Sequence, residues 1–219
     1  MDKIKISVNC FAKYMTSTPS QQRKILQGIK YQTDENRAMI NYYKDARRII
    51  KEYHKSKFNK NWLINKAKTL NQLSLSVSGQ SSKRLKRNAE VIKNYSENFE
   101  NKSYDFDGTL KLKYSFSKID INISSDLNLK RKNKKKIVKL GFLKEEPDTK
   151  VAKIICQLTF ETCKNENILL PSSSFEYFDI ERGKILKFAR EGSKLKKDIE
   201  AACLNIEAIW DTIPKPNKN

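Results

Sequence analysis

Clusters of lysine and arginine are the side chains whose types and spacing point most directly to a chemistry, the binding of phosphate. One cluster, residues 83–87, falls at the start of a predicted helix, where positive charge opposes the helix dipole. A second, residues 130–136, is predicted to form a loop or a strand tip. Tyrosines near residues 47 and 48 could stack on unpaired bases, or else pack in the core. We expect nucleic acid to contact Arg47, Arg48, Lys83, Arg84, Lys86, Arg87, Arg131, Lys132, Lys134, Lys135 and Lys136.

The overall balance of charge favours an anionic partner. The chain has 45 Lys and Arg against 25 Asp and Glu, which gives a formal net charge of +20 over 219 residues. Such an excess repels itself unless a dense anion offsets it, and nucleic acid is the commonest such anion. Two alternatives stay open: a lysine-rich composition typical of AT-rich genomes, and a solvated tip at residues 130–136. We expect no membrane contact, because the apolar helix faces are needed for the core.

Other kinds of site find little support in the sequence. The four cysteines form no CxxC pair and there is one histidine, His54, so a zinc site is not expected. We predict that the cysteines are reduced core thiols and that His54 is exposed at a helix end. No apolar run approaches the ~20 residues of a membrane span, and the first residues lack an apolar signal-peptide core. The sequence therefore predicts a cytoplasmic protein, with no glycine-rich phosphate loop or hydrolase elbow.

Helical patterns dominate the chain before residue 105. A first helical stretch, 11–31, is interrupted at Ser17–Ser20, where Thr18 is predicted as an N-cap and Pro19 as the first helical residue. Further helices are predicted at 34–55, at 62–75 and from about 83 to 99. The second helix, 34–55, has apolar residues at alternating spacings of three and four, which predicts packing against the first helix as a hairpin. These seam residues are Met39, Tyr42, Ala46, Ile49 and Tyr53.

After residue 105 the apolar period changes to two, which is typical of strands. Residues 110–116 and 118–129 are predicted to form an antiparallel pair joined near Ser117. The further predicted elements are a strand at 137–143, a helix at 150–164, strands at 175–180 and 185–188, and a helix at 193–212. This order predicts an α/β (α+β) fold, with a helical N-terminal part followed by a small mixed sheet flanked by helices. The predicted domains are a helical region at 1–80, a mixed domain at 81–213 and a flexible tail at 214–219.

The triplets Ser125-Asp126-Leu127 and Ile137-Val138-Lys139 lie on the second and third strands of this predicted meander. With them, residues 83–188 resemble the core of the PD-(D/E)xK nuclease superfamily in the order helix, three strands, helix, strand. The resemblance implies that Asp126 binds Mg²⁺ and that Lys139 orients the attacking water. It also implies a glutamate on the preceding helix, Glu97 or Glu100, with Glu90 less well placed.

The chain departs from the family pattern at two positions. Ile137 stands where the second acidic ligand is expected, and Ser125 stands where proline is expected. One carboxylate does not hold Mg²⁺ tightly, so catalysis requires Asp120, Glu161 or the helix glutamate to enter the site. Alternatively, Asp126 and Lys139 are ordinary polar strand residues. We expect a nucleic-acid-binding protein, a divergent or inactive nuclease-like subunit of a mobile-element or phage-defence system. The alternatives are an active Mg²⁺-dependent nuclease, and a subunit that binds a protein partner or a second copy through the 34–55 helix.

Overall fold

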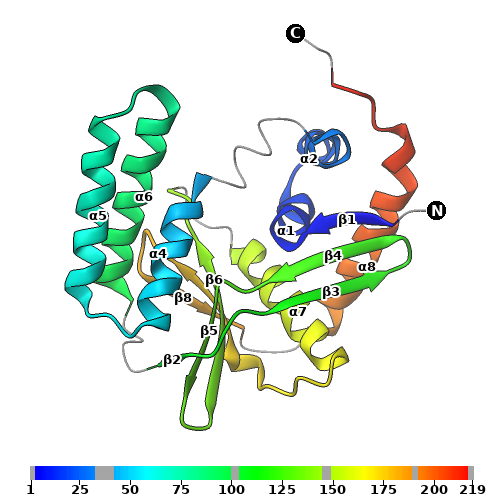
Figure 1. The fold of residues 1–219 in the computed structure, drawn as a ribbon. Coiled ribbons are helices and arrows are strands. Elements are labelled where there is room, and N and C mark those ends of the chain that lie inside the picture. The colour runs from blue at the N-terminus through cyan, green and yellow to red at the C-terminus, as the bar shows by residue number, and fades with distance from the viewer. Residues whose placement is uncertain (1–2, 33–41, 100–103, 145–148, 189–191, 217–219) are drawn as a thin grey trace.

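The computed structural model describes residues 3–32, 42–99, 104–144, 149–188 and 192–216, which form an α/β fold with two mixed sheets (Figure 1). The predicted fold class is therefore confirmed. The helices are α1 (Val8–Thr16), α2 (Pro19–Tyr31), α4 (Lys44–Lys55), α5 (Lys60–Leu75), α6 (Gly79–Asn98), α7 (Thr149–Asn165) and α8 (Ser193–Ile209). The strands are β1 (Ile4–Ser7), β2 (Asp105–Phe106), β3 (Lys111–Phe116), β4 (Ile119–Ser124), β5 (Leu127–Arg131), β6 (Lys134–Gly141), β7 (Phe175–Asp179) and β8 (Lys184–Lys187).

The smaller sheet has the strand order β1-β4-β3, with β1 parallel and β3 antiparallel to β4. Alternation along these strands buries isoleucines on one face, such as Ile6 and Ile121, and leaves Lys5 and Asn122 exposed on the other. The buried face packs with α1, α7 and α8 in one hydrophobic core. The short strand β1 is an element that the sequence did not predict.

The larger sheet has the strand order β2-β5-β6-β7-β8. Strands β6 and β7 are parallel and are connected through α7, while the other neighbours are antiparallel. Val138 and Leu140 of β6 face a second core built with α4, α5 and α6, whereas Ile137 faces the first core and α7. Figure 1 shows α4, α5 and α6 together on one side of this sheet. Helices on both faces therefore bury the middle of β6.

One continuous predicted strand, 118–129, is divided between the two sheets. The chain leaves the smaller sheet after Ser124 and enters the larger one at Leu127. Ser125 secures the crossing, since its hydroxyl accepts a hydrogen bond from the Leu110 N–H at 2.7 Å and donates to Asn128 Oδ1 at 2.6 Å. The apolar alternation continues in phase across this point, so the period alone did not indicate the change of sheet.

Several local predictions agree with the structure. Thr18 caps α2 in a capping box with Gln21, and Pro19 is the first helical residue. The chain also turns near Ser117, between β3 and β4, as expected. The 34–55 helix is described from residue 42, and here the predicted hairpin is corrected. Helix α4 packs on α5 and α6, not on the first helices, because Ala46 and Ile49 belong to the second core.

The two cores do not divide the chain at residue 80. The first core joins α1 and α2 to β3, β4, α7 and α8, and the second joins α4, α5 and α6 to β5, β6 and β7. Each core thus contains residues from both sides of the predicted boundary. In the predicted tail, the Pro214 carbonyl accepts a hydrogen bond from Gln27 at 2.9 Å, and residues 217–219 lie outside the described residues.

Candidate functional site

Asp126 and Lys139, the two residues taken from the nuclease resemblance, lie side by side at the base of the β5–β6 hairpin. Lys139 Nζ is 3.4 Å from Asp126 Oδ2, and Arg47 Nε is 3.2 Å from Asp126 Oδ1. Asp126 Oδ2 also accepts a hydrogen bond from the Leu140 N–H at 2.9 Å. We call Arg47, Asp126 and Lys139 the Asp126 cluster. Both oxygens of its carboxylate are engaged by groups of the chain itself.

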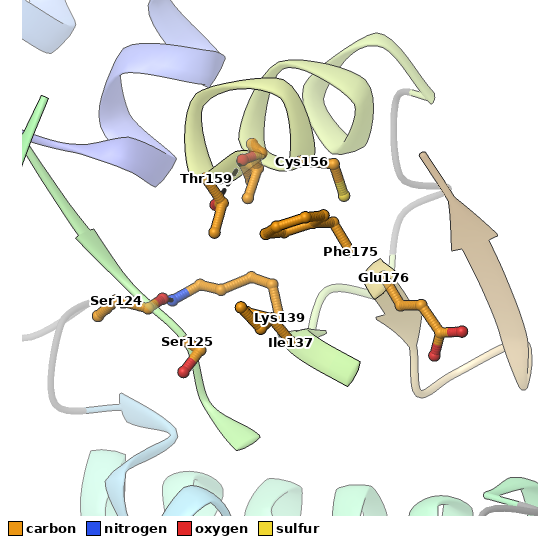
Figure 2. Close-up of a pocket in the computed structure, with 9 residues that line it drawn as sticks. Ser124, Ser125, Ile137, Lys139, Cys156, Thr159, Phe175 and Glu176 are labelled. Carbon is orange, nitrogen blue, oxygen red and sulfur yellow. Dashed lines mark hydrogen bonds between the residues drawn. The ribbon is translucent and has the colours of Figure 1, made fainter. Parts of the chain in front are cut away.

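Lys139 is directed toward the crossing between the two sheets. Its ammonium donates to the Ser124 carbonyl at 2.9 Å, and Figure 2 shows the extended side chain reaching that residue. This carbonyl is the last of β4, where the ladder of the smaller sheet ends. The lysine therefore supplies a hydrogen bond to a strand end that is leaving its sheet.

Both polar and apolar residues line a small cavity beside Lys139. Ile137, on the same face of β6, lines a cavity of about 10 Å³ together with Ile155, Cys156 and Phe175. Figure 2 shows Phe175 over the lysine stem, and Glu176 pointing away from the cavity. A cavity needs roughly 10–15 Å³ to hold one water. This cavity, as the described residues shape it, is too small for a hydrated metal ion and a phosphate.

Among the described residues, those implied as metal ligands do not meet at Asp126. Glu97 is exposed near the end of α6, and Glu100 lies outside the described residues. Asp120 is held by Lys3 and Lys113 in the smaller sheet, where a hydrogen bond from Ser115 is the main cause that lowers its pKa. Among the residues that the structure describes, no three His, Cys, Asp or Glu side chains form a group that could hold a metal. These residues do not fit Mg²⁺.

Exposed cations gather at the other end of the β5–β6 hairpin, where a two-residue turn joins the strands. In the ladder, Lys130 lies opposite Lys135, and Arg131 lies opposite Lys134. Lys132 occupies the turn with a φ of 50°, and all five side chains are exposed. Like charges directly opposite each other on neighbouring strands destabilise a sheet. The Arg131–Lys134 pair therefore carries a local cost to stability, whereas Lys130 also lies opposite Asp105 of β2.

The short edge strand β2 connects this tip to α4. Lys57, just after α4, is 2.8 Å from Asp105, and Lys135 is 3.2 Å from Asp107. Lys51 of α4 lies over the Phe106 ring at 5.9 Å. We call this surface the basic edge: Lys51, Lys57, Lys130, Arg131, Lys132, Lys134 and Lys135. Within it, the carboxylates of Asp105 and Asp107 are outnumbered by cations. The run at 130–136 was predicted, whereas the contribution of β2 and Lys57 was not.

The second predicted basic run, residues 83–87, lies elsewhere. Figure 1 shows the start of α6 at the opposite end of the molecule from the β5–β6 turn. Lys83 and Lys86 are exposed, and Arg84 is half-buried. Arg87, by contrast, is buried: its guanidinium is 2.6 Å from Glu181 and donates to the Phe142 carbonyl at 3.0 Å. The structure gives Arg87 a role in joining α6 to the larger sheet, which corrects its prediction as a surface residue.

The remaining predicted residues near α4 also include both internally packed and exposed side chains. Arg47 packs its guanidinium over Phe142 at 4.7 Å and belongs to the Asp126 cluster, while Arg48 is exposed beside Glu52. Tyr43 stacks on Phe142 at 4.9 Å, so it packs internally. Lys136, at the inner end of the basic run, is 3.0 Å from buried Glu176.

His54 corrects a further prediction, because it is buried and not exposed at a helix end. Its Nε2 is 2.6 Å from the Tyr95 hydroxyl, and its ring meets Phe99 edge-on at 5.4 Å. Burial lowers the pKa of His54 to about 4, so the imidazole is neutral near pH 7. No serine or cysteine nucleophile is paired with it among the described contacts, and its hydroxyl partner is a core tyrosine.

The cysteines are all free thiols, and three of them are buried. Burial is the main cause that raises the pKa of Cys156 to about 12, which keeps this thiol protonated.

None of the described helices is long and apolar enough to span a membrane. No protein-family model matches the chain, and no curated protein matches its sequence.

Proposed function

We propose that this protein binds nucleic acid through phosphate contacts at the basic edge. The observation that carries the proposal is the exposed like-charge cross-strand pair Arg131 and Lys134, which flanks Lys132 at the tip and adjoins Lys130 and Lys135. A bound polyanion would offset this repulsion and release its own counterions.

The proposal includes a nuclease-like core that serves as a scaffold without metal-dependent hydrolysis. In support, the carboxylate of Asp126 is bound by Arg47, Lys139 and the Leu140 N–H, and the cavity that Ile137 lines has a volume of about 10 Å³, no more than one water needs. We further propose a cytoplasmic location, because the free and buried thiols suit a reducing compartment. Within this proposal, the seam of α4 serves internal packing, since Ala46 and Ile49 are buried.

The test is fluorescence anisotropy with labelled duplex DNA, single-stranded DNA and RNA in a salt series. A basic-edge variant carries Arg131→Gln, Lys132→Gln, Lys134→Gln and Lys135→Gln. Its matched control carries Lys5→Gln, Lys194→Gln, Lys196→Gln and Lys197→Gln, which remove the same charge from exposed positions elsewhere.

We expect the wild-type protein to bind with a steep loss of affinity as salt rises. In the basic-edge variant the slope of log affinity against log salt falls by about three, from four lost phosphate contacts. The control variant should keep most of the slope of the wild-type protein. Absence of binding at low salt, or equal losses in the two variants, would contradict the proposal. Incubation with Mg²⁺ or Mn²⁺ should leave each oligonucleotide intact.

A further inference from the structure

Two aromatic rings stack at the junction of α4 and α5, beside the basic edge. The rings of Phe58 and Trp62 have centroids 4.3 Å apart and an angle of 14° between their planes. Trp62 packs against the second hydrophobic core, whereas Phe58 is 37% exposed. The inner ring is thus anchored, and the outer ring is exposed to solvent.

The backbone holds this stack in a fixed position. Lys57 has a φ of 52°, which turns the chain after α4, and the Phe58 N–H donates to the Tyr53 carbonyl at 3.1 Å. Asn59 then caps α5, since its side chain accepts a hydrogen bond from the Trp62 N–H at 3.1 Å. Trp62 therefore lies in the first turn of α5, and Phe58 directly precedes the N-cap residue Asn59.

Positive charge surrounds the stack. Lys66 Nζ lies 5.2 Å from the centre of the Trp62 ring, and Lys60 is exposed in the first turn of α5. The sequence contains no Asp or Glu between Glu52 and Glu90. Across the fold, Asp105 pairs with Lys57 and connects this junction to the basic edge. An exposed aromatic ring among lysines is a combination that binds the bases and backbone of a single strand.

We propose that Phe58, supported by Trp62, is a stacking platform for an unpaired base, so that the protein prefers single-stranded to duplex nucleic acid. This inference rests on the proposed function and deepens it. In a duplex the base faces are stacked on one another, so only an unpaired base can lie on the ring. The neighbouring lysines would contact the phosphates on either side of that base.

Tryptophan fluorescence reports on the platform directly. The chain has two tryptophans, Trp62 and Trp210, so Trp210→Phe leaves Trp62 as the single tryptophan, which is excited selectively over the tyrosines at the red edge of the absorption band. In this background, oligo-dT should quench or shift the emission, and duplex DNA of equal length should not. Two variants of Phe58 form a matched pair: Phe58→Tyr keeps the flat ring, and Phe58→Leu keeps the apolar bulk without it.

We expect Phe58→Leu to weaken oligo-dT binding on the order of tenfold and to leave duplex binding unchanged, since one stacked base is lost. Phe58→Tyr should bind like wild type, and thermal melts should show that both variants are folded. Unchanged oligo-dT affinity in Phe58→Leu, or equal losses for oligo-dT and duplex, would overturn the stacking platform. In either case the basic edge could still bind phosphates. Absence of all binding in the wild-type protein would instead overturn the proposed function as well.

Discussion

The Asp126 cluster and the tip of the basic edge lie at opposite ends of one hairpin, β5–β6. They differ in how far their charged side chains are paired with opposite charges of the chain. At the base, one carboxylate lies between two cations and a backbone N–H, in contact with buried residues. At the tip, Arg131 faces Lys134 across the ladder, and both side chains are exposed. Charges with internal partners stabilise the fold, and charges without enough internal partners are available to a ligand. The difference separates residues that support the hairpin from residues that we propose to bind.

The largest expected effect comes from removing the carboxylate at the base of the hairpin. Asp126→Ala leaves Lys139 as a buried cation without its counter-ion and removes the acceptor of the Leu140 N–H. Breaking a buried ion pair from one side costs about 4 kcal/mol in the free energy of unfolding. Urea denaturation measures this loss. Asp126→Asn, which retains a carbonyl acceptor, should lose less, and an Asp126→Ala variant as stable as wild type would contradict the structural role.

Two neighbouring cations in one basic run, Lys86 and Arg87, differ in burial in the same way. Arg87 is buried against Glu181, whereas Lys86, one residue earlier, is exposed. Arg87→Ala should lower the free energy of unfolding by about 3 kcal/mol, because Glu181 and the Phe142 carbonyl lose their partner. Lys86→Ala should change it by less than about 0.5 kcal/mol. Equal effects in thermal or urea unfolding would show that position in the run, and not burial, sets the role of these cations.

The buried imidazole of His54, on α4, makes the free energy of unfolding depend on pH. The pKa of His54 is lowered from 6.5 to about 4 by burial, so between these values the unfolded chain binds a proton that the folded chain does not. The contribution of neutral His54 to the free energy of unfolding is therefore fully present above pH 6.5, and it falls as the pH drops toward 4. The loss from this group approaches about 3 kcal/mol. Urea denaturation of wild type and His54→Gln at about pH 7.5 and about pH 4.5 checks it, since the variant should show a shallower decrease.

The smallest effect is also the most specific to the tip. Arg131→Gln removes one member of the like-charge pair with Lys134, so it should raise the free energy of unfolding by about 0.2–1 kcal/mol. The same change should weaken binding and lower the salt slope by about 0.7–0.9, from one lost phosphate contact. Paired measurements of unfolding and anisotropy would detect these opposite signs. A variant that is destabilised, or that binds as tightly as wild type, would show that the tip is not a ligand-binding surface with uncompensated charge.

Local patterns in the sequence predicted local structure well. The Thr18–Pro19 boundary needs only neighbouring residues, as does the β3–β4 pair, and both are present. What could not be predicted depends on distant partners. Strand β1 has four residues and pairs with β4 over more than a hundred residues of chain, so its two isoleucines give a weak signal.

In the candidate site, too, the features that could not be predicted depend on distant partners. That Asp126 and Lys139 meet was expected from the resemblance, but the partners that occupy the carboxylate were not, because Arg47 comes from a helix far earlier in the chain. Arg87 resembles a surface cation in the sequence until Glu181 is placed beside it. One available signal was overlooked: the stretch without acidic residues between Glu52 and Glu90, which contains Phe58 and Trp62.

The central claim is that the tip of the hairpin binds nucleic acid while its base supports the fold. The most direct test is one anisotropy experiment, in which a labelled single strand is titrated across a salt series with three folded proteins: wild type, Asp126→Asn and the basic-edge variant. We predict that Asp126→Asn keeps the affinity and salt slope of wild type, and that the basic-edge variant loses most of both. Loss of binding in Asp126→Asn with retention in the basic-edge variant would contradict the account.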